Sequence, residues 1–184
     1  MHTFVSDYSL SVTEKQENIL KAALMLFATQ GYAATSTSKV AKAAGVSEGL
    51  IFRHFGSKEG LLSAILEMAS EAMQQKMAPI VMASEPKDIL TKLFEMLFSI
   101  QESEHEMWKL VYALKWQTDS YDAAKYASLK LVLNNAFEKL GYEDPEAETE
   151  LVFMIMDGIA TSFLLHKPEN KQDILKGLKS KYKL

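Results

Sequence analysis

The chain has 184 residues, of which 48% are hydrophobic and 24% charged, and its formal net charge is −4. This composition excludes a disordered protein, and the length suffices for one or two domains with an apolar core. Cysteine is absent, which excludes disulfides, thiolate metal sites and cysteine nucleophiles. No apolar run reaches the roughly 20 residues of a membrane helix, and residues 1–11 show no secretory signal pattern. We therefore expect a cytoplasmic protein without membrane association.

The scarcity of turn residues predicts an all-α protein of about nine helices. Only 8 Gly and 4 Pro stand against many helix-forming residues. Apolar spacing and chain breaks place the helices at residues 13–30, 37–44, 47–55, 57–78, 88–103, 104–118, 122–140, 145–166 and 171–182. Thr13 and Gln16 form a capping box for the first helix, and the fourth is expected to stop before Pro79.

Residues 35–58 read TSTSKVAKAAGVSEGLIFRHFGSK and carry the motif with the clearest chemical meaning. A helix-turn-helix needs a small residue at the helix crossing, a turn residue that tolerates positive φ, and a branched apolar residue on the second helix. Ala41, Gly45 and Ile51 supply these three roles at offsets of four and six residues. The second helix, which Ser47 is expected to cap, would enter a DNA major groove with its first turn.

The run GYAATSTSKVAKAAGVSEGLIFRHFGSKEGLLSAIL resembles the N-terminal domain of tetracycline-repressor (TetR) family regulators. The resemblance covers about residues 13–66. It implies an N-terminal helix-turn-helix domain of three helices over residues 1–58 and a C-terminal helical bundle over residues 59–184. The bundle would bind a small effector and dimerise, and the homodimer would bind a near-palindromic DNA operator.

The resemblance also places the DNA contacts on this chain. They fall on the second and third helices and at the start of the fourth: Ser38, Lys39, Ser47, Glu48, Gly49, Leu50, Phe52, Arg53, His54 and Lys58. Lys39 and Arg53 can neutralise phosphates, and an arginine can also bind guanine through two hydrogen bonds. Isolated lysines are more often ordinary solvated charges, and Gly45 and Gly49 can be purely conformational.

Three of these positions depart from the usual family pattern. Glu48 can accept a hydrogen bond from a cytosine amino group, but it also repels phosphate. Leu50 and Phe52 can contact thymine methyl groups but cannot form hydrogen bonds. The segment before Thr13 has no Lys or Arg, so insertion of an N-terminal arm into the minor groove is not expected.

Charge is unevenly distributed along the chain. Residues 1–60 hold six Lys and Arg against five acids, residues 61–166 hold eight Lys against seventeen acids, and residues 167–184 hold six Lys against two acids. The net negative charge therefore belongs mainly to the presumed effector domain, and it does not exclude a DNA partner for the weakly basic N-terminal part.

An aromatic and methionine-rich set of side chains suggests a cavity for an apolar or planar effector. The candidates are Met73, Phe94, Phe98, Trp108, Tyr112, Trp116, Tyr126 and Asp157. The competing interpretation is plain core, because an aromatic stripe at helical spacing usually packs inside the protein. Asp157 is included because a carboxylate buried within an apolar helix needs a partner; a dimer seam is the other position for it.

The last two helices, residues 145–166 and 171–182, resemble the pair with which the family forms a four-helix dimer interface. The expected seam consists of Val152, Ile155, Met156, Ile159, Phe163, Ile174, Leu175 and Leu178.

These features favour a ligand-responsive transcription regulator, with repression as the favoured sign and with no cofactor. An enzyme is disfavoured because the sequence has no nucleophile elbow, phosphate-binding glycine loop or His-x-x-x-His metal pair. The alternative is a helical sensor or interaction protein of the same fold that has lost specific DNA binding. Glu48 and the thin basic content support that alternative.

The thin basic content predicts a shallow salt dependence of DNA binding. Few phosphate contacts release few counterions, so we expect less than the roughly thousandfold loss of affinity, between about 50 and 200 mM salt, that six or more contacts produce. Fluorescence anisotropy over a salt series would measure the slope. A slope typical of many phosphate contacts would contradict the prediction.

Overall fold

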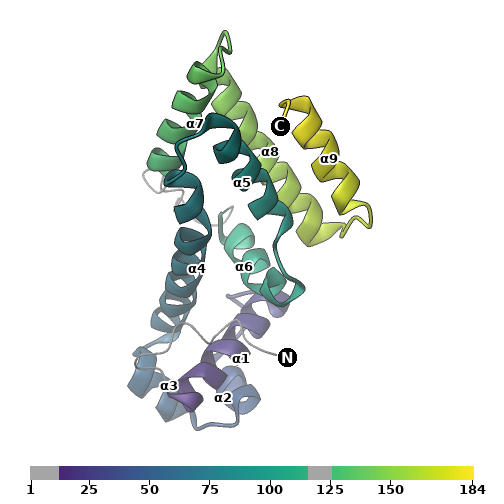
Figure 1. The fold of residues 1–184 in the computed structure, drawn as a ribbon. Coiled ribbons are helices and arrows are strands. Elements are labelled where there is room, and N and C mark those ends of the chain that lie inside the picture. Colours follow the sequence, from purple (N-terminus) through teal and green to yellow (C-terminus); the bar gives the residue numbers. More distant parts are fainter. Residues whose placement is uncertain (1–12, 116–125) are drawn as a thin grey trace. The chain divides into compact units, whose positions relative to one another are not determined.

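The computed structural model describes residues 13–115 and 126–184, which form nine α-helices, one 3-10 turn and no strand (Figure 1). The all-α prediction is therefore confirmed. No helix in these two ranges is both long enough and apolar enough to span a membrane. The elements are α1 (Glu14–Gln30), α2 (Thr37–Ala44), α3 (Glu48–Phe55), α4 (Lys58–Val81), α5 (Pro86–Phe98), the 3-10 turn η1 (Glu102–Glu104), α6 (His105–Lys115), α7 (Ala127–Lys139), α8 (Pro145–Leu165) and α9 (Lys171–Lys181).

The first three helices begin and end where local sequence signals place them. The Thr13 side chain accepts a hydrogen bond from the backbone N–H of Gln16, and the Gln16 side chain accepts one from the backbone N–H of Thr13. This capping box satisfies N–H groups that the first turn of α1 leaves without helical partners. Gly31 then ends α1 with φ of 86°, a conformation that residues with a side chain rarely adopt.

Two later boundaries differ from the predictions. Helix α4 does not stop before Pro79 but continues to Val81. The hydrogen bond that Pro79 cannot donate would go to the carbonyl of Gln75, which is an exposed residue. Helix α5 ends at Phe98, five residues earlier than expected, and the Ser99 hydroxyl donates to the carbonyl of Met96 at 2.8 Å.

The chain divides into two compact units, and the division differs from the predicted boundary at residue 58. One unit comprises Met1–Ala72 with Gln101–Asp119, and the other Met73–Ile100 with Ser120–Leu184. The first unit thus takes the start of α4 and the whole of α6 in addition to the three N-terminal helices. The functional division into DNA-binding and effector domains stays a prediction.

The core of the first unit forms around α1, which α2 and α6 flank. Its buried side chains come from α1, α2, α3, α4 and α6: Ile19, Leu20, Ala23, Phe27, Val40, Ala41, Ile51, Leu61, Ile65 and Leu110. Helices of eight residues are unstable alone in water, so α2 and α3 depend on this burial.

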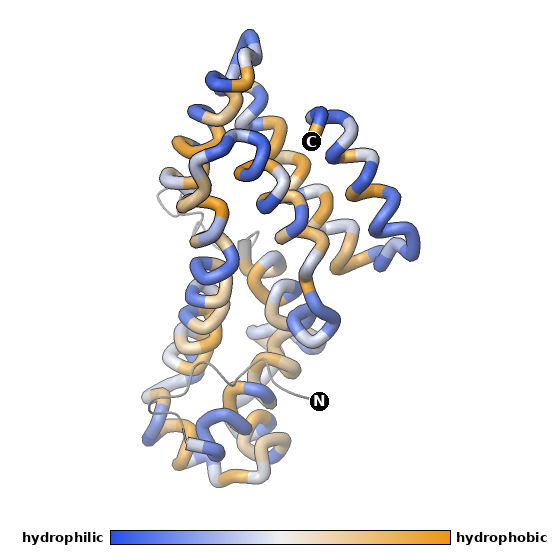
Figure 2. The backbone as a smooth tube through the Cα atoms, in the orientation of Figure 1, coloured by the Kyte–Doolittle hydropathy of each residue, from blue (hydrophilic) through white to orange (hydrophobic). Residues whose placement is uncertain are grey.

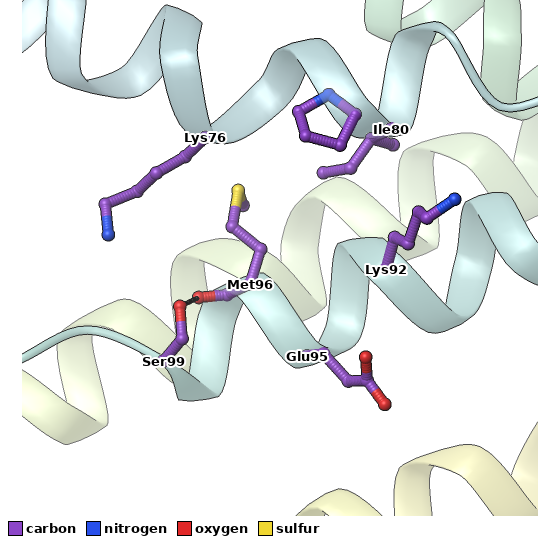
Figure 3. Close-up of a pocket in the computed structure, with 7 residues that line it drawn as sticks. Lys76, Ile80, Lys92, Glu95, Met96 and Ser99 are labelled. Atoms are coloured by element: carbon purple, nitrogen blue, oxygen red, sulfur yellow. Dashed lines mark hydrogen bonds between the residues drawn. The ribbon is translucent and has the colours of Figure 1, made fainter.

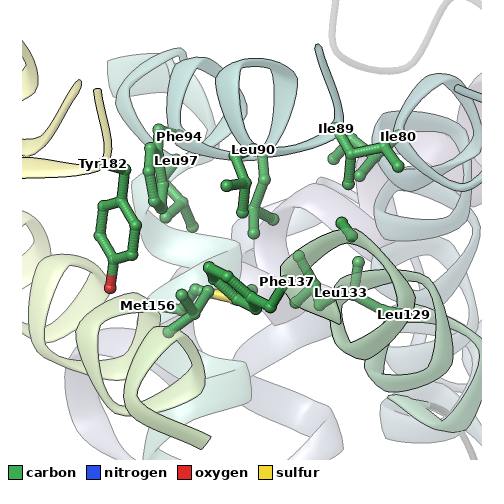
Figure 4. Close-up of a cluster of buried hydrophobic side chains, with 13 residues drawn as sticks. Ile80, Ile89, Leu90, Phe94, Leu97, Leu129, Leu133, Phe137, Met156 and Tyr182 are labelled. Atoms are coloured by element: carbon green, nitrogen blue, oxygen red, sulfur yellow. The ribbon is translucent and has the colours of Figure 1, made fainter. Parts of the chain in front are cut away.

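The core of the second unit is built from α5, α7 and α8 (Figure 4). Leu90, Phe94, Leu133, Phe137 and Val152 are almost completely excluded from solvent. Figure 2 shows the contrast between the mainly hydrophobic α8 and the mainly hydrophilic α9. Accordingly, α9 itself contributes no fully buried side chain.

Helix α9 packs on the core of the second unit through the partly buried side chains of Leu175 and Leu178, and polar groups add contacts with α5. Lys179 pairs with Glu95 at 2.6 Å, and Lys87 donates to the carbonyl of Lys183 at 2.7 Å. The Tyr182 ring lies 5.2 Å from that of Phe94. Burial raises the pKa of Tyr182 to about 12, with smaller contributions from Glu148 and Tyr142.

Two leucines of α7 provide a matched test of this core. Leu133 is completely buried, whereas Leu131, two positions earlier, is 62% exposed. Leu133→Ala should lower the free energy of unfolding by about 2–5 kcal/mol because it leaves a cavity, and Leu131→Ala should change it by less than about 0.5 kcal/mol. Urea unfolding followed by circular dichroism measures both. Equal losses in the two variants would contradict the assigned packing.

Candidate nucleic-acid interface

The turn between α2 and α3 depends on the backbone of Gly45. This residue has φ of 67° and ψ of 33°, the left-handed conformation in which a side chain on the α-carbon is unfavourable. Its N–H donates to the carbonyls of Ala41 and Lys42, and the N–H of Val46 donates to the carbonyl of Ala41 at 3.0 Å. The chain thereby ends α2 and reverses into α3 within three residues.

The small and branched residues predicted to lock α3 onto α2 are buried. Val40 and Ile51 are completely excluded from solvent, and Ala41 is 4% exposed. Because Ile51 occupies the middle of α3 and faces inward, the residues on the opposite side of this short helix face outward. The helix-turn-helix roles predicted for Ala41, Gly45 and Ile51 are therefore confirmed by burial and backbone geometry.

All ten predicted DNA contacts lie in the first unit, on α2, on α3 and its cap, or in the first turn of α4. Six are exposed: Ser38, Lys39, Ser47, Gly49, Phe52 and Arg53. The remaining four are half-buried: Glu48, Leu50, His54 and Lys58. Phe52 is 47% exposed, which is a large fraction for an aromatic residue.

The first turn of α3 differs from the predicted capping. Ser47 occupies the N-cap position, but its side chain forms no capping hydrogen bond. Glu48, the first residue of α3, accepts a hydrogen bond from the hydroxyl of Thr37, the first residue of α2, at 2.5 Å. The carboxylate is thus fixed between the two helices, and the Ser47 hydroxyl is not used as a cap.

Three cations of the candidate interface form no ion pair with another described residue. Lys39 contacts the Gln30 side-chain oxygen at 3.5 Å and the carbonyl of Ala34 at 3.4 Å, both neutral groups. Lys58 donates to the carbonyl of Ala33 at 3.4 Å. Arg53, the only arginine of the sequence, is exposed. Within residues 13–115 and 126–184, none of the three forms an ion pair that would neutralise it.

Tyr32 organises the start of α4. The Lys58 ammonium lies 4.3 Å from the centre of the Tyr32 ring, and the Tyr32 hydroxyl donates to Glu59 at 3.2 Å. Burial raises the pKa of Tyr32, and the neighbouring Glu59 carboxylate raises it further. The pKa of Glu59 is lowered, first by a hydrogen bond from its own backbone N–H and then by Ser57. The tyrosine therefore stays protonated and supports Lys58.

The sequence did not indicate that Thr37 or Tyr32 supports side chains of the candidate interface. The Thr37 contact joins two helices across eleven residues, so no helical periodicity reveals it. Tyr32 belongs to the Gly-Tyr pair that contributed to the family resemblance, and that pair was the available signal.

The predicted effector residues fall in both units and are partly accounted for by packing. In the second unit, Phe94 contacts Tyr182, Phe98 lies 5.0 Å from Phe163, and Tyr126 lies 5.9 Å from Phe153. Met73 is half-buried on α4, and in the first unit Tyr112 is half-buried on α6. For the three ring pairs, the structure supports the core interpretation.

The remaining predicted effector residues differ in their burial. Trp108 is 4% exposed, and its indole N–H finds no hydrogen-bond acceptor among the described residues. Trp116 lies outside the described residues. Asp157 is exposed on α8, so the argument that it is a buried carboxylate is wrong. His105 is buried at the start of α6.

An open groove of about 290 Å³ lies between the end of α4 and α5 in the second unit (Figure 3). It is lined by Lys76, Pro79, Ile80, Lys92, Glu95, Met96 and Ser99. Figure 3 shows Met96 pointing from α5 toward α4. None of the predicted effector residues that the structure describes lines this groove.

The apolar face of α8 also differs from the predicted dimer seam. Val152, Met156 and Phe163 are buried within the protomer and are not available to a second copy. The exposed large apolar side chains of α8 are instead Leu151, Met154 and Leu165, and α9 adds Ile174. Their spacing of three and eleven residues keeps Leu151, Met154 and Leu165 on one side of the helix.

The left-handed turn, the buried crossing and the exposed face of α3 together define a helix-turn-helix domain of the DNA-binding type. Residues 19–65 match the family described as bacterial regulatory proteins, tetR family. Residues 19–65 therefore form a domain of the tetR family type, and the relative AcrR, which matches about half of this chain, is an HTH-type transcriptional regulator.

Individual relatives agree with this assignment. The HTH-type transcriptional regulator AcrR of Shigella flexneri is 41% identical over 90 residues, which are 49% of this chain and 41% of AcrR. The chain thus matches about two fifths of that relative's length. The structure of the ketosteroid transcriptional regulator KstR2 of Mycobacterium tuberculosis aligns with a TM-score of 0.74 at 20% identity, over 92% of this chain and 93% of KstR2.

A third comparison extends the fold to the whole chain. The TetR family transcriptional regulator PfmR of Thermus thermophilus aligns over 94% of this chain and 96% of its own, with a TM-score of 0.69 and 20% identity. At these identities the solved structures show a shared fold.

Proposed function

We propose that the protein is a ligand-responsive transcription regulator that binds operator DNA as a homodimer in the bacterial cytoplasm and acts as a repressor. The observation that carries the DNA-binding part is the helix-turn-helix itself, whose outward face combines Ser47, Phe52 and Arg53. Lys39 and Lys58 flank it, and among the described residues neither lysine forms an ion pair. A helix of this kind enters the major groove with its first turns, while flanking cations bind phosphates.

The contacts divide by chemistry. Lys39 and Lys58 bind phosphates as point charges, and the Ser47 hydroxyl, which forms no cap, donates to a phosphate oxygen. Arg53 binds either a phosphate or the O6 and N7 atoms of guanine, and Phe52 contacts a thymine methyl group. We assign Ser38, Gly49, Leu50 and His54 to the same DNA-facing surface, although Leu50 also packs in part against the core.

We further propose that a small apolar or planar effector binds near Trp108. Its buried indole N–H, which lacks an acceptor among the described residues, supports this more directly than the aromatic rings already packed in the core. Helix α4, which contributes residues to both units, carries the response to the recognition helices. Two such helices must match major grooves about 34–36 Å apart, so a shift of a few ångströms lowers DNA affinity. The ligand supplies the energy through its different affinity for the two states.

The homodimer is proposed to form through α8 and α9, with Leu151, Met154, Leu165 and Ile174 in the seam. Four large apolar side chains exposed on two helices of one protomer support an interface. Between Met154 and Leu165, the exposed residues Gly158 and Thr161 are small enough to let a partner helix approach closely.

DNA binding is tested on the side chain of Arg53. Arg53→Ala should raise the Kd for the DNA upstream of the protein's own coding region by about tenfold or more, enough to remove the band shift at protein concentrations where wild type half-shifts. The free energy of unfolding should change by less than about 0.5 kcal/mol because the residue is exposed.

Lys42→Ala is the matched control, since it removes one exposed positive charge from the same domain at a position outside the proposed contacts. It should shift DNA nearly as wild type does. If both variants raise the Kd equally, Arg53 contributes only a nonspecific positive charge to DNA binding. Failure of the wild-type chain to shift any DNA would favour the helical sensor or interaction protein instead.

The seam is tested by placing a charge at Met154. Met154→Glu should convert a dimer, of twice the 20.6 kDa chain mass, into a monomer at micromolar concentration, because an unpaired carboxylate is costly in an apolar interface. Met25→Glu is the control, since Met25 is exposed to a similar degree, 61% against 68%, but lies on α1. Light scattering distinguishes the outcomes. A wild-type monomer contradicts the dimer, and a dimeric Met154→Glu variant contradicts this face.

A further inference from the structure

The contact between Thr37 and Glu48 joins the first residues of α2 and α3. The Thr37 hydroxyl donates to the Glu48 carboxylate at 2.5 Å, and the bond is partly buried. Each residue lies at the N-terminal end of its helix, where the helix dipole favours negative charge. The carboxylate is therefore held in one place by a hydrogen bond and by the helix ends, rather than moving freely in solvent.

This position is the part of a helix-turn-helix that lies closest to base edges. In this motif the N-terminal residues of the second helix contact bases in the major groove. Glu48 opens α3, and Phe52 stands one turn later on the same side with 47% of its surface exposed. The Thr37 hydroxyl occupies one carboxylate oxygen, so the other remains as an acceptor for a base.

The charge of Glu48 selects among the possible groups on DNA. Phosphates repel a carboxylate. In the major groove guanine presents only the N7 and O6 acceptors, and thymine presents the O4 acceptor and a methyl group. Adenine has an amino donor, but its N7 acceptor lies beside it. Cytosine presents the N4 amino group as a donor without an adjacent acceptor on the same base, which makes it the base that a fixed carboxylate accepts best.

We propose that Glu48 is a specificity-determining residue that requires cytosine at the base pair facing the first turn of α3, and that Thr37 is its positioning residue. The inference rests on the proposed DNA-binding function and names one feature of the operator. It assigns Thr37 a role in base selection in addition to its place in the first turn of α2.

The experiment is selection of binding sites from random duplexes by the full-length chain, followed by Kd measurements on the enriched site with each base at every position. Wild type should prefer cytosine at one position by about tenfold or more, within the range expected for a good base contact. Glu48→Gln should move the preference at that position toward adenine, because an amide can bind N6 and N7 together.

The positioning role is tested by Thr37→Val, which keeps the side-chain shape but removes the hydroxyl. It should reduce the cytosine preference to less than about threefold while leaving preferences at other positions unchanged. Thr37→Ser restores a hydroxyl and should restore the preference. Circular dichroism of each variant verifies that the domain is folded.

Different results would contradict the role of Glu48, the role of Thr37 and specific DNA binding itself. An unchanged base preference in Glu48→Gln overturns the specificity role, including the case in which affinity rises equally for all sequences because a repulsive charge has gone. A uniform loss of affinity in Thr37→Val, without a change in base preference, overturns the positioning role. If wild type enriches no sequence at all, specific DNA binding itself fails, and the inference fails with it.

Discussion

The close crossing of α2 and α3 at Ala41, made possible by the left-handed turn at Gly45, is the constraint on which the N-terminal unit depends. Two helices of eight residues have too few internal hydrogen bonds to persist in water. They persist here because Val40, Ala41 and Ile51 complete a core begun by α1. The same burial fixes the rotation of α3 and so decides which side chains face outward.

For a DNA partner, the charges near the candidate interface matter more than the net charge of the chain. The formal charge of −4 averages an acidic middle segment with weakly basic ends. At the candidate interface, Lys39 and Lys58 contact neutral carbonyl, amide and aromatic groups, so their positions are constrained without an ion pair. Salt screens exposed charges over about 10 Å, so local arrangement governs a partner at contact distance more than net charge does.

In the second unit, helix packing determines which large apolar side chains lie in the core and which stay exposed. Phe94, Phe137 and Tyr182 pack against one another and close the core. Asp157, in contrast, faces out of α8. A helix of 21 residues that is apolar on several sides can present more than one stripe, and its neighbours α5 and α7 determine which stripe turns inward. Leu151, Met154 and Leu165 are the large side chains left outside.

The sequence by itself determined the features that arise from short-range chemistry. Thr13 with Gln16, Gly31, and the spacing of Ala41, Gly45 and Ile51 predicted helix ends and a turn, because capping and left-handed backbone depend on a few adjacent residues. The exposed position of Arg53 on α3 followed from the same local pattern.

Only the tertiary structure decided which of several equally apolar faces is buried, and which distant polar groups meet. Val152 and Met156 are inside while Leu151 and Met154 are outside, although their side chains are similar, because α5 and α7 cover only one side of α8. The Thr37 hydroxyl reaches Glu48 only after the turn has brought two helix ends together. Such contacts depend on how helices pack in three dimensions, and periodicity along one helix does not encode that.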